Sequence, residues 1–346
     1  MADAVIPIQN IYYLLSYAWN RLRESEIVQA DRLDCMNIHN LLAKVLANGI
    51  VCVFHRGLDR GYVEIDEDIN RIRGKIDFAA TLKHHGFQRA SIRCHFDDFR
   101  YDVLHNQIIK TTIHRLVRCR DLDSSIRSDL MTIYRRFEGV QCISLTKRHF
   151  GMVQLSSNNI FYDFLLKICE LFHDSMLVSE IEGAIKFRDF VRDERFMATV
   201  FEDFIRNFYK REQREFKVGR ENIPWCARAR DEGAERFLPR MQSDVSLESG
   251  NRKIIIDAKY YRETLQSNYD IEKIHSANLY QLLAYVTNLR AVTHQDQTCE
   301  GILLYPTVNR EFHQRYDLQG YPICIHTINL NQDWRGIHQN LLGFLH

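Results

Sequence analysis

The chain has few residues that interrupt regular structure, with only five prolines and fifteen glycines among 346 residues. Together with a hydrophobic content of 45%, this composition is typical of a well-packed globular protein and argues against long flexible linkers. The chain also lacks any stretch that approaches the ~20 apolar residues needed to cross a bilayer. Its N-terminus has no basic segment followed by an apolar run. We therefore expect a cytoplasmic protein that does not contact a membrane.

Several common site patterns are also missing. The nine cysteines are widely spread, odd in number and contain no C-x-x-C pair, so neither a zinc site nor a disulfide framework is indicated. The fifteen histidines contain no H-E-x-x-H pattern. No phosphate-binding loop of the form G-x-x-x-x-G-K-[ST] is present, because Gly74-Lys75 is followed by Ile76. We expect that this chain binds no nucleotide.

Charge gives little information about partners. The chain carries 46 lysines and arginines against 45 aspartates and glutamates, a formal net charge of +1. That balance argues against a protein that coats nucleic acid without specificity. Any contact with a polyanion must therefore come from a local patch.

The most informative segment that is present runs from Asp244 to Lys259. A Gly250-Asn251 break separates two short β-like runs and predicts a hairpin in which Ser249 faces Arg252. That register places Asp244 directly opposite Asp257, with Cβ atoms about 5 Å apart on one face. It also pairs Glu248 with Lys253, and it stacks valine, leucine and isoleucine side chains on the other face.

This arrangement fits metal-dependent phosphodiester chemistry. Asp244 and Asp257 can share a divalent cation, with the Ala258 carbonyl as a possible further ligand. A bound Mg²⁺ polarises a phosphate and lowers the pKa of water, while Lys259 stabilises developing charge. The alternative is an ordinary ion pair between Asp257 and Lys259 at a solvated strand end. The short pattern D-x-K by itself favours the ordinary ion pair. The additional carboxylate of Asp244, opposite Asp257, favours the metal site.

The length of the chain predicts two domains, and we place them at residues 1–160 and 161–346. Asn10 is a candidate N-cap for a helix whose apolar stripe includes Ile11, Leu14 and Leu22. Further helical, strand and hairpin patterns predict an α+β or α/β chain. Its N-terminal domain mixes helices with a small sheet, and its C-terminal domain has a mixed sheet flanked by helices. These expected elements are helices at about 38–54, 105–120, 124–137, from 196, from 276 and from 333; short strands within 56–99; and strands at 301–305 and 321–330.

Weaker candidates surround the hairpin. Gln281 and Tyr285 are spaced i, i+4 on an expected helix, so they share a face and either contact a phosphate or form a polar helix edge. Glu202 is on the preceding helix, where a third carboxylate would reach a metal, but we favour an exposed solubilising residue. A near-helical row of basic residues fits either a DNA-tracking stripe or a solvated helix face, and it comprises Arg206, Lys210, Arg214 and Lys217.

With these residues in hand, the chain resembles the McrC family, the nuclease subunits of McrBC modification-dependent restriction systems. The resemblance covers nearly the whole length and is carried by several short runs. These runs are Ile6-Pro7-Ile8-Gln9-Asn10-Ile11-Tyr12-Tyr13, Arg73-Gly74-Lys75-Ile76, Leu238-Pro239-Arg240-Met241 with Asp244, Ile256-Asp257-Ala258-Lys259-Tyr260-Tyr261, Asn278-Leu279-Tyr280-Gln281-Leu282 and the Trp334 region.

The resemblance implies an N-terminal partner-docking domain and a C-terminal nuclease of the PD-(D/E)XK type, with Asp244, Asp257 and Lys259 at the catalytic positions. It implies an McrB-like AAA+ hexamer as partner, which hydrolyses GTP, and double-stranded DNA with modified cytosine as substrate. Loops of the N-terminal half are expected to enter the pore of that ring. One departure is that Met241-Gln242-Ser243 precedes Asp244, without the proline of the motif's name.

Three functions follow from this sequence. The leading prediction is a Mg²⁺-dependent DNA endonuclease subunit that acts with a GTP-driven ring and stimulates its GTP hydrolysis. The second is an activator or adaptor of that ring, which rests on the long N-terminal half. The third is a free-standing DNA-repair nuclease, which cleavage without GTP or partner would support.

Overall fold

A computed structural model describes residues 6–21, 23, 37–155, 159–178, 185–261, 275–292, 298–308 and 311–346. The chain divides into two compact units. One combines residues 1–23 with residues 189–346 and is called the sheet unit, and the other spans residues 24–188 and is called the helical unit. This division differs from the predicted one at residue 160, and each unit is described by itself.

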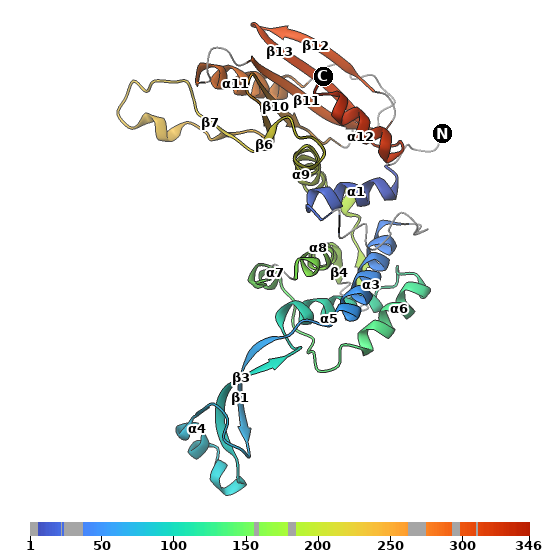
Figure 1. Ribbon diagram of the computed structural model, residues 1–346, viewed down its shortest axis with the longest axis vertical. Coiled ribbons are helices and arrows are strands. Elements are labelled where there is room, and N and C mark those ends of the chain that lie inside the picture. The colour runs from blue at the N-terminus through green and yellow to red at the C-terminus, as the bar shows by residue number, and fades with distance from the viewer. Residues whose placement is uncertain are drawn as a thin grey trace. The chain divides into compact units, whose positions relative to one another are not determined.

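The sheet unit contains one large sheet with helices packed around it (Figure 1). Its helices are α1 (Ile8–Ala18), α9 (Glu194–Glu212), α11 (Ser276–Val292) and α12 (Trp334–Gly343), with 3₁₀ turns at Phe190–Arg192 and Ala234–Phe237. Its strands are β6 (Lys217–Gly219), β7 (Asn222–Ile223), β8 (Met241–Gln242), β9 (Val245–Glu248), β10 (Arg252–Ala258), β11 (Thr298–Thr307), β12 (His313–Leu318) and β13 (Tyr321–Asn329).

The large sheet is mixed, as predicted, with the strand order β12-β13-β11-β10-β9-β6. Strands β10, β11 and β13 are parallel, and the strands toward both edges run antiparallel to their neighbours. Helix α11 lies between β10 and β11 in sequence, as a parallel pair requires. It covers the face that carries Ile255 and Leu303. Helix α9 covers the opposite face, where the Phe201 ring lies 6.3 Å from that of Tyr260.

Helix α1 belongs to the sheet unit because its apolar face packs on α9 and α12. Tyr13 stacks on Trp334 with ring centroids 4.8 Å apart. Asn10 is buried and donates hydrogen bonds to the main-chain oxygens of Leu330 and Gln332, both at 2.8 Å. The predicted N-cap role of Asn10 is therefore wrong, since the helix begins at Ile8. Leu22 of the predicted stripe lies outside the described residues.

The helical unit packs its helices together and extends a three-stranded sheet away from them (Figure 1). Its helices are α3 (Ile38–Arg56), α4 (Phe78–Lys83), α5 (Leu104–Val117), α6 (Ser124–Arg135), α7 (Lys147–Met152) and α8 (Ile160–Ser175), with a 3₁₀ turn at Gly86–Arg89. Its strands are β1 (Gly61–Ile69), β2 (Lys75–Ile76), β3 (Ile92–Arg100), β4 (Met176–Val178) and β5 (Ile185–Phe187). The predicted small sheet within residues 56–99 is thus present as β1-β3-β2.

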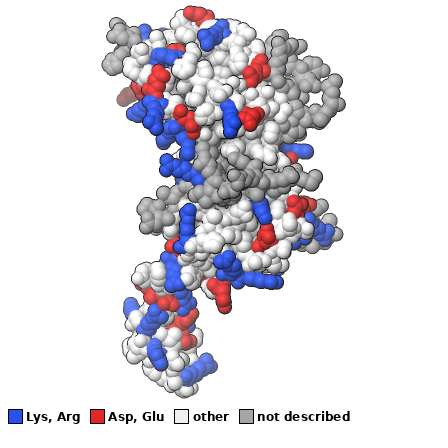
Figure 2. Space-filling view, turned by 45° about the vertical axis from the view of Figure 1, so that its right-hand side comes forward, with Lys and Arg blue, Asp and Glu red and all other residues white. Residues whose placement is uncertain are grey.

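Charges of both signs are intermixed along the small sheet (Figure 2). Arg93 pairs with Asp66 at 2.6 Å, and Arg73 pairs with Asp98 at 2.8 Å. Gly74 lies at φ +68°, and a Cβ atom there would be 2.3 Å from the main-chain oxygen of His95. The run Arg73-Gly74-Lys75-Ile76 therefore has a local structural cause: only glycine fits where β2 meets β3.

The predicted boundary at residue 160 fails because packing extends across it. Helix α8 begins at Ile160 and contacts α3 and α5, so it belongs with the helices before it.

Helix α3 is long and apolar enough to meet the length and composition of a membrane-crossing helix, although no membrane span was expected from the sequence. Because 61% of its apolar window is buried within the structure, α3 is better explained as a core helix.

Candidate metal and catalytic site

The predicted hairpin and its register are confirmed. Strands β9 and β10 pair with Glu248 opposite Lys253 and Val245 opposite Ile256. The turn closes with a hydrogen bond from the Ser249 N–H to the Arg252 oxygen at 2.8 Å. The predicted apolar face is fully buried and comprises Val245, Leu247, Ile254 and Ile256. A fixed register is expected where a sheet face is buried this completely.

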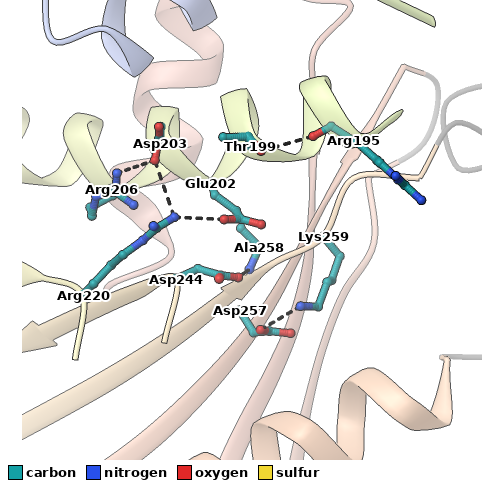
Figure 3. A network of polar contacts seen from close by, with 10 residues as sticks. All are labelled: Arg195, Thr199, Glu202, Asp203, Arg206, Arg220, Asp244, Asp257, Ala258 and Lys259. Carbon is teal, nitrogen blue, oxygen red and sulfur yellow. Dashed lines mark hydrogen bonds and ion pairs between the residues drawn. The ribbon is translucent and has the colours of Figure 1, made fainter. Parts of the chain in front are cut away.

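The ladder ends at the pair of Val245 and Ile256, one step before the predicted pair of aspartates. Asp244 immediately precedes β9, and its side chain reaches across to β10. Its Oδ2 accepts a hydrogen bond at 3.0 Å from the main-chain N–H of Ala258, the residue after Asp257 (Figure 3). The two aspartates are therefore brought together at the end of β10, through a side-chain contact in place of a regular ladder pair.

Asp257 is an unusual carboxylate because it is only 1% exposed. Burial raises its pKa to about 7; the positive charge of Lys259 opposes the rise, and the negative charge of Asp244 adds to it. One oxygen, Oδ1, accepts from the Lys259 ammonium at 2.9 Å. The other oxygen, Oδ2, is buried and accepts no hydrogen bond from any of the residues that the structure describes. The ion pair between Asp257 and Lys259 is therefore present, but the predicted alternative is wrong in placing it on a solvated strand end.

Lys259 lies on the same side of the strand end as Asp257 (Figure 3). Burial pushes the pKa of its ammonium down, but the charges of Asp257 and Asp244 outweigh this effect and raise the pKa above its ordinary value. Lys259 is consequently a fixed positive charge and a hydrogen-bond donor at neutral pH. It is not available there as a general base.

These residues fit a divalent cation. A buried carboxylate oxygen without a donor costs free energy unless a cation or a proton compensates it. No group of three histidine, cysteine, aspartate or glutamate side chains suited to a metal occurs in the part of the chain that the structure describes. The available donors are two carboxylates and the main chain, which suits Mg²⁺, since that ion keeps several waters and uses one or two carboxylates with substrate phosphates.

Glu202 lies closer to this site than we predicted. It projects from α9 toward Asp244 and is half-buried, with 26% of its side chain exposed (Figure 3). Burial raises the pKa of Glu202, and the negative charge of Asp244 adds to the rise. Its Oε2 accepts from Arg220 at 3.0 Å. The preferred interpretation of Glu202 as an exposed solubilising residue is therefore wrong. Helical periodicity predicts which face of the helix a residue lies on, but it does not predict which other element packs against that face.

Helix α11 supplies the polar groups on the other side. Gln281 donates a hydrogen bond to the Tyr285 hydroxyl at 2.7 Å, so the predicted i, i+4 pair shares a face and is in contact. Burial raises the pKa of Tyr285, and the charges of Asp257 and Asp244 add to the rise. Tyr285 also packs in one cluster with Ile255, which lies on the same face of β10 as Asp257, so the pair is on the side of the sheet that carries Asp257. Its role in binding a phosphate stays a prediction.

The predicted basic stripe does not form a helix face. Helix α9 ends at Glu212, so Arg214 lies beyond it and Lys217 is the first residue of β6. Arg206 forms an ion pair with Asp203, three residues earlier on α9. Arg220, which follows β6, forms an ion pair with Glu202 at 3.0 Å.

Glu221 belongs to none of the sequence motifs, yet it has a clear structural role next to the hairpin. Lys253 is 5% exposed, and its ammonium donates to Glu221 at 2.7 Å, closer than the predicted partner Glu248 at 3.8 Å. The Ser246 hydroxyl donates to the second oxygen of Glu221. No sequence pattern reveals this pairing, because β6 and its register with β9 were not predicted.

Fold and site together define an α+β protein whose mixed sheet carries two aspartates and a lysine at one strand end. Residues 9–306 match the family described as McrBC 5-methylcytosine restriction system component. The chain is also 33% identical over 342 residues to the Type IV methyl-directed restriction enzyme EcoKMcrBC of Escherichia coli strain K12, covering 99% of this chain and 98% of that protein. The chain therefore belongs to the McrBC family of restriction system components.

A solved assembly has a similar fold. It is described as a refined half-complex from a tetradecameric assembly of Thermococcus gammatolerans McrB AAA+ hexamers with bound McrC. The TM-score is 0.57 at 17% sequence identity, over 98% of this chain and 76% of the compared chain. At that identity the similarity concerns the fold.

Proposed function

We propose that this chain is the DNA-cleaving subunit of a modification-dependent restriction complex, with a PD-(D/E)XK-type nuclease site formed by Asp244, Asp257 and Lys259. The observation that carries the proposal is the buried Oδ2 of Asp257, which has no donor among the described residues and lies beside a second carboxylate and a lysine. This arrangement is costly without a cation and has no evident role in stability. Membership of a restriction system family supplies DNA with modified cytosine as the substrate.

In this proposal, Asp244, Asp257 and the carbonyl of Ala258 hold Mg²⁺. The bound ion supplies Lewis-acid polarisation of the phosphate and lowers the pKa of a coordinated water. Lys259 remains protonated and donates to the phosphate or to the attacking water, where it stabilises the developing charge. Gln281 and Tyr285 border the substrate from α11 and orient it through hydrogen bonds.

Asp257→Asn tests the proposal because it keeps the side-chain volume and removes the charge. In complex with a GTP-hydrolysing partner ring, the variant should lose at least about 10²-fold in cleavage of methylated plasmid. GTP hydrolysis by the ring should be unchanged, because the site takes no part in it. Asp317→Asn on β12 is the matched control and should cleave normally. Unchanged cleavage by Asp257→Asn would contradict the proposal.

A second role, activation of the partner ring, is favoured by the helical unit. Its projecting sheet and adjoining helix expose large apolar side chains, among them Tyr62, which is 78% exposed, and Phe99, which is 53% exposed. Exposed apolar groups of this kind mark interaction sites. Since the chain shares its fold with an McrC seen bound to McrB AAA+ hexamers, we propose that the helical unit docks on such a ring in the cytoplasm.

A fragment of residues 24–188 alone should then bind the ring and accelerate its GTP hydrolysis. The same fragment with Tyr62→Ser and Phe99→Ser should bind the ring more weakly and accelerate GTP hydrolysis less. Failure of the wild-type fragment both to bind and to stimulate would contradict the activator role. It would leave the nuclease proposal standing. Cleavage that requires neither GTP nor ring would instead favour a free-standing nuclease.

A further inference from the structure

Residues 224–240 form a projecting segment of the sheet unit, here called the arm. Strands β7 and β8 close its base, with Asn222 opposite Gln242 and Ile223 opposite Met241. Figure 1 shows the arm as a loop that extends from the sheet next to β7. All of its residues are exposed except two alanines that are half-buried. A segment of this length that buries so little is not explained by packing within its own unit.

The arm is nevertheless held in place at its base. The Trp225 indole donates to the Pro239 oxygen at 2.6 Å, which joins the two sides of the loop. The main-chain N–H of Cys226 donates to Asn288 on α11, also at 2.6 Å. Because α11 also carries Gln281 and Tyr285, the arm and the candidate catalytic site are attached to the same helix.

The arm contains four arginines. Within the described ranges, no ion pair with a carboxylate involves Arg228, Arg230, Arg236 or Arg240, although three acidic residues lie in the same arm. Elsewhere in this unit, Arg206, Arg220 and Arg252 do form such pairs. Arg240 is instead oriented by Asn222, whose side-chain oxygen accepts from Nε at 2.8 Å and from Nη2 at 2.7 Å. An oriented guanidinium without a carboxylate partner is suited to a phosphate.

Apolar side chains accompany these charges. Phe237 is 75% exposed, and the Arg236 guanidinium lies over its ring at 4.8 Å. A hollow of about 520 Å³ is lined by Trp225 and Leu238 and by the charged side chains of Arg240 and Glu235. The apolar lining alone would suit a peptide. The four arginines form no ion pair with a carboxylate among the described residues, and this favours a polyanion, because sugar and phosphate contacts account for most protein–DNA hydrogen bonds.

The arm is also close to the place of the proposed chemistry. Arg240 precedes Asp244 by four residues, and an extended chain covers about 13 Å over that distance. The same length corresponds to about four base pairs of B-form DNA. We propose that the arm binds the sugar–phosphate backbone of duplex DNA beside the scissile phosphate, with Arg230 and Arg240 as direct phosphate contacts. This proposal rests on the proposed nuclease function of the adjacent site.

The test measures binding of the full chain to an end-labelled duplex across a series of salt concentrations, with Ca²⁺ in place of Mg²⁺. Arg230→Ala combined with Arg240→Ala removes two charges from the arm. Arg315→Ala combined with Arg335→Ala removes two equally exposed charges from β12 and α12, and β12 is the opposite edge of the sheet from β6. All four positions are exposed, so both double variants should unfold at the wild-type midpoint.

The arm variant should bind about tenfold more weakly near 0.1 M salt, with a plot of log affinity against log salt that is shallower by about 2, one per lost phosphate contact. The control variant should keep the wild-type slope. Equal slopes for all three proteins, equal weakening by both variants, or no binding of wild type at low salt would overturn the proposal. If cleavage is lost in Asp257→Asn while the arm variant binds normally, the arm assignment fails and the nuclease proposal stands. If Asp257→Asn cleaves normally while the arm variant binds DNA more weakly, the nuclease proposal fails and DNA binding by the arm stands.

Discussion

At the scale of single residues, the site depends on charges that are costly by themselves. Asp257 is buried, one of its oxygens has no donor among the described residues, and Asp244 and Glu202 place further negative charge nearby. The negative charge of Asp244 adds to the rise in the pKa of Asp257 and of Glu202, because like charges at short range disfavour the ionised forms. A divalent cation reverses that balance, which is why these positions are best explained by function.

Glu202→Gln tests whether the third carboxylate contributes to the field at the metal. We expect the variant to need several-fold more Mg²⁺ for half-maximal cleavage, because one negative charge near Asp244 is lost. Glu212→Gln is the matched control, since Glu212 is also a carboxylate of α9 that pairs with an arginine, but its partner is Arg211 at 3.3 Å. A Mg²⁺ requirement that is identical in Glu202→Gln and wild type would show that Glu202 only holds Arg220.

His326 gives a pH dependence of stability that is independent of the proposed site. Its ring is stacked on that of Phe344, and its Nδ1 forms a hydrogen bond with Nδ1 of His313 at 3.0 Å. Burial lowers the pKa of His326 to about 4, and the charges of His313 and Arg315 add to the fall. The folded pKa is below the unfolded value of about 6.5, so the unfolded state binds the proton more tightly. Stability should therefore fall as pH decreases from about 6.5 to 4.

For this single group, the loss between pH 7 and pH 5 should be about 2 kcal/mol. His326→Gln removes the titrating group, so the variant's unfolding free energy should change less with pH than that of wild type by this amount. Urea unfolding of both proteins at the two pH values measures the difference. Parallel pH profiles would mean that His326 is as easily protonated in the folded state as in the unfolded one.

At the scale of elements, the small sheet of the helical unit depends on Gly74. Alanine there would combine a positive φ with a Cβ contact of 2.3 Å to main chain, and we expect a cost of about 2–3 kcal/mol. Gly139 also has positive φ but open space around it, so Gly139→Ala should cost only about 1 kcal/mol. Amide hydrogen exchange of β1 and β3 reports the difference. Equal protection of these strands in both variants would contradict the predicted clash.

The hairpin was predictable because its information is local. A Gly-Asn turn between two alternating runs fixes the register, and the register brings Asp244 to the end of β10. Glu202, Glu221 and Asn10 could not be placed in the same way, since their partners are distant in sequence. Asn10 bonds to the main chain of Leu330, 320 residues away. Strand β12 was missed because its side chains are almost all exposed and show no apolar alternation.

At the scale of the whole molecule, the N-terminal helix is part of the sheet unit although the helical unit separates them in sequence. Asn10→Ala should lower the unfolding free energy of the sheet unit by about 2 kcal/mol, because the buried main-chain oxygen of Leu330 and the partly buried one of Gln332 lose their donor. Gln9→Ala, at an exposed position of the same helix, is the control and should change it by less than about 0.5 kcal/mol. Equal effects of the two changes in urea unfolding would argue against this anchoring role.

The two proposed roles fall on different units. The sheet unit contains the aspartates, the lysine and the arm, and the helical unit exposes the apolar side chains expected of a docking surface. The boundary could not be taken from the sequence, because composition does not change at residue 188 and the first helix folds with the end of the chain. Only the packing of α1 and α8 assigns these segments to their units.

Binding of Mn²⁺ to the full chain tests the central claim most directly, with electron paramagnetic resonance measuring the free ion. The wild-type protein should bind Mn²⁺ saturably. Near pH 7, binding should also release protons, because the cation lowers the raised pKa of Asp257. Asp257→Asn should weaken binding by at least about tenfold, and Asp317→Asn should bind like wild type. Equal Mn²⁺ affinity in wild type and Asp257→Asn would contradict a metal site at Asp244 and Asp257.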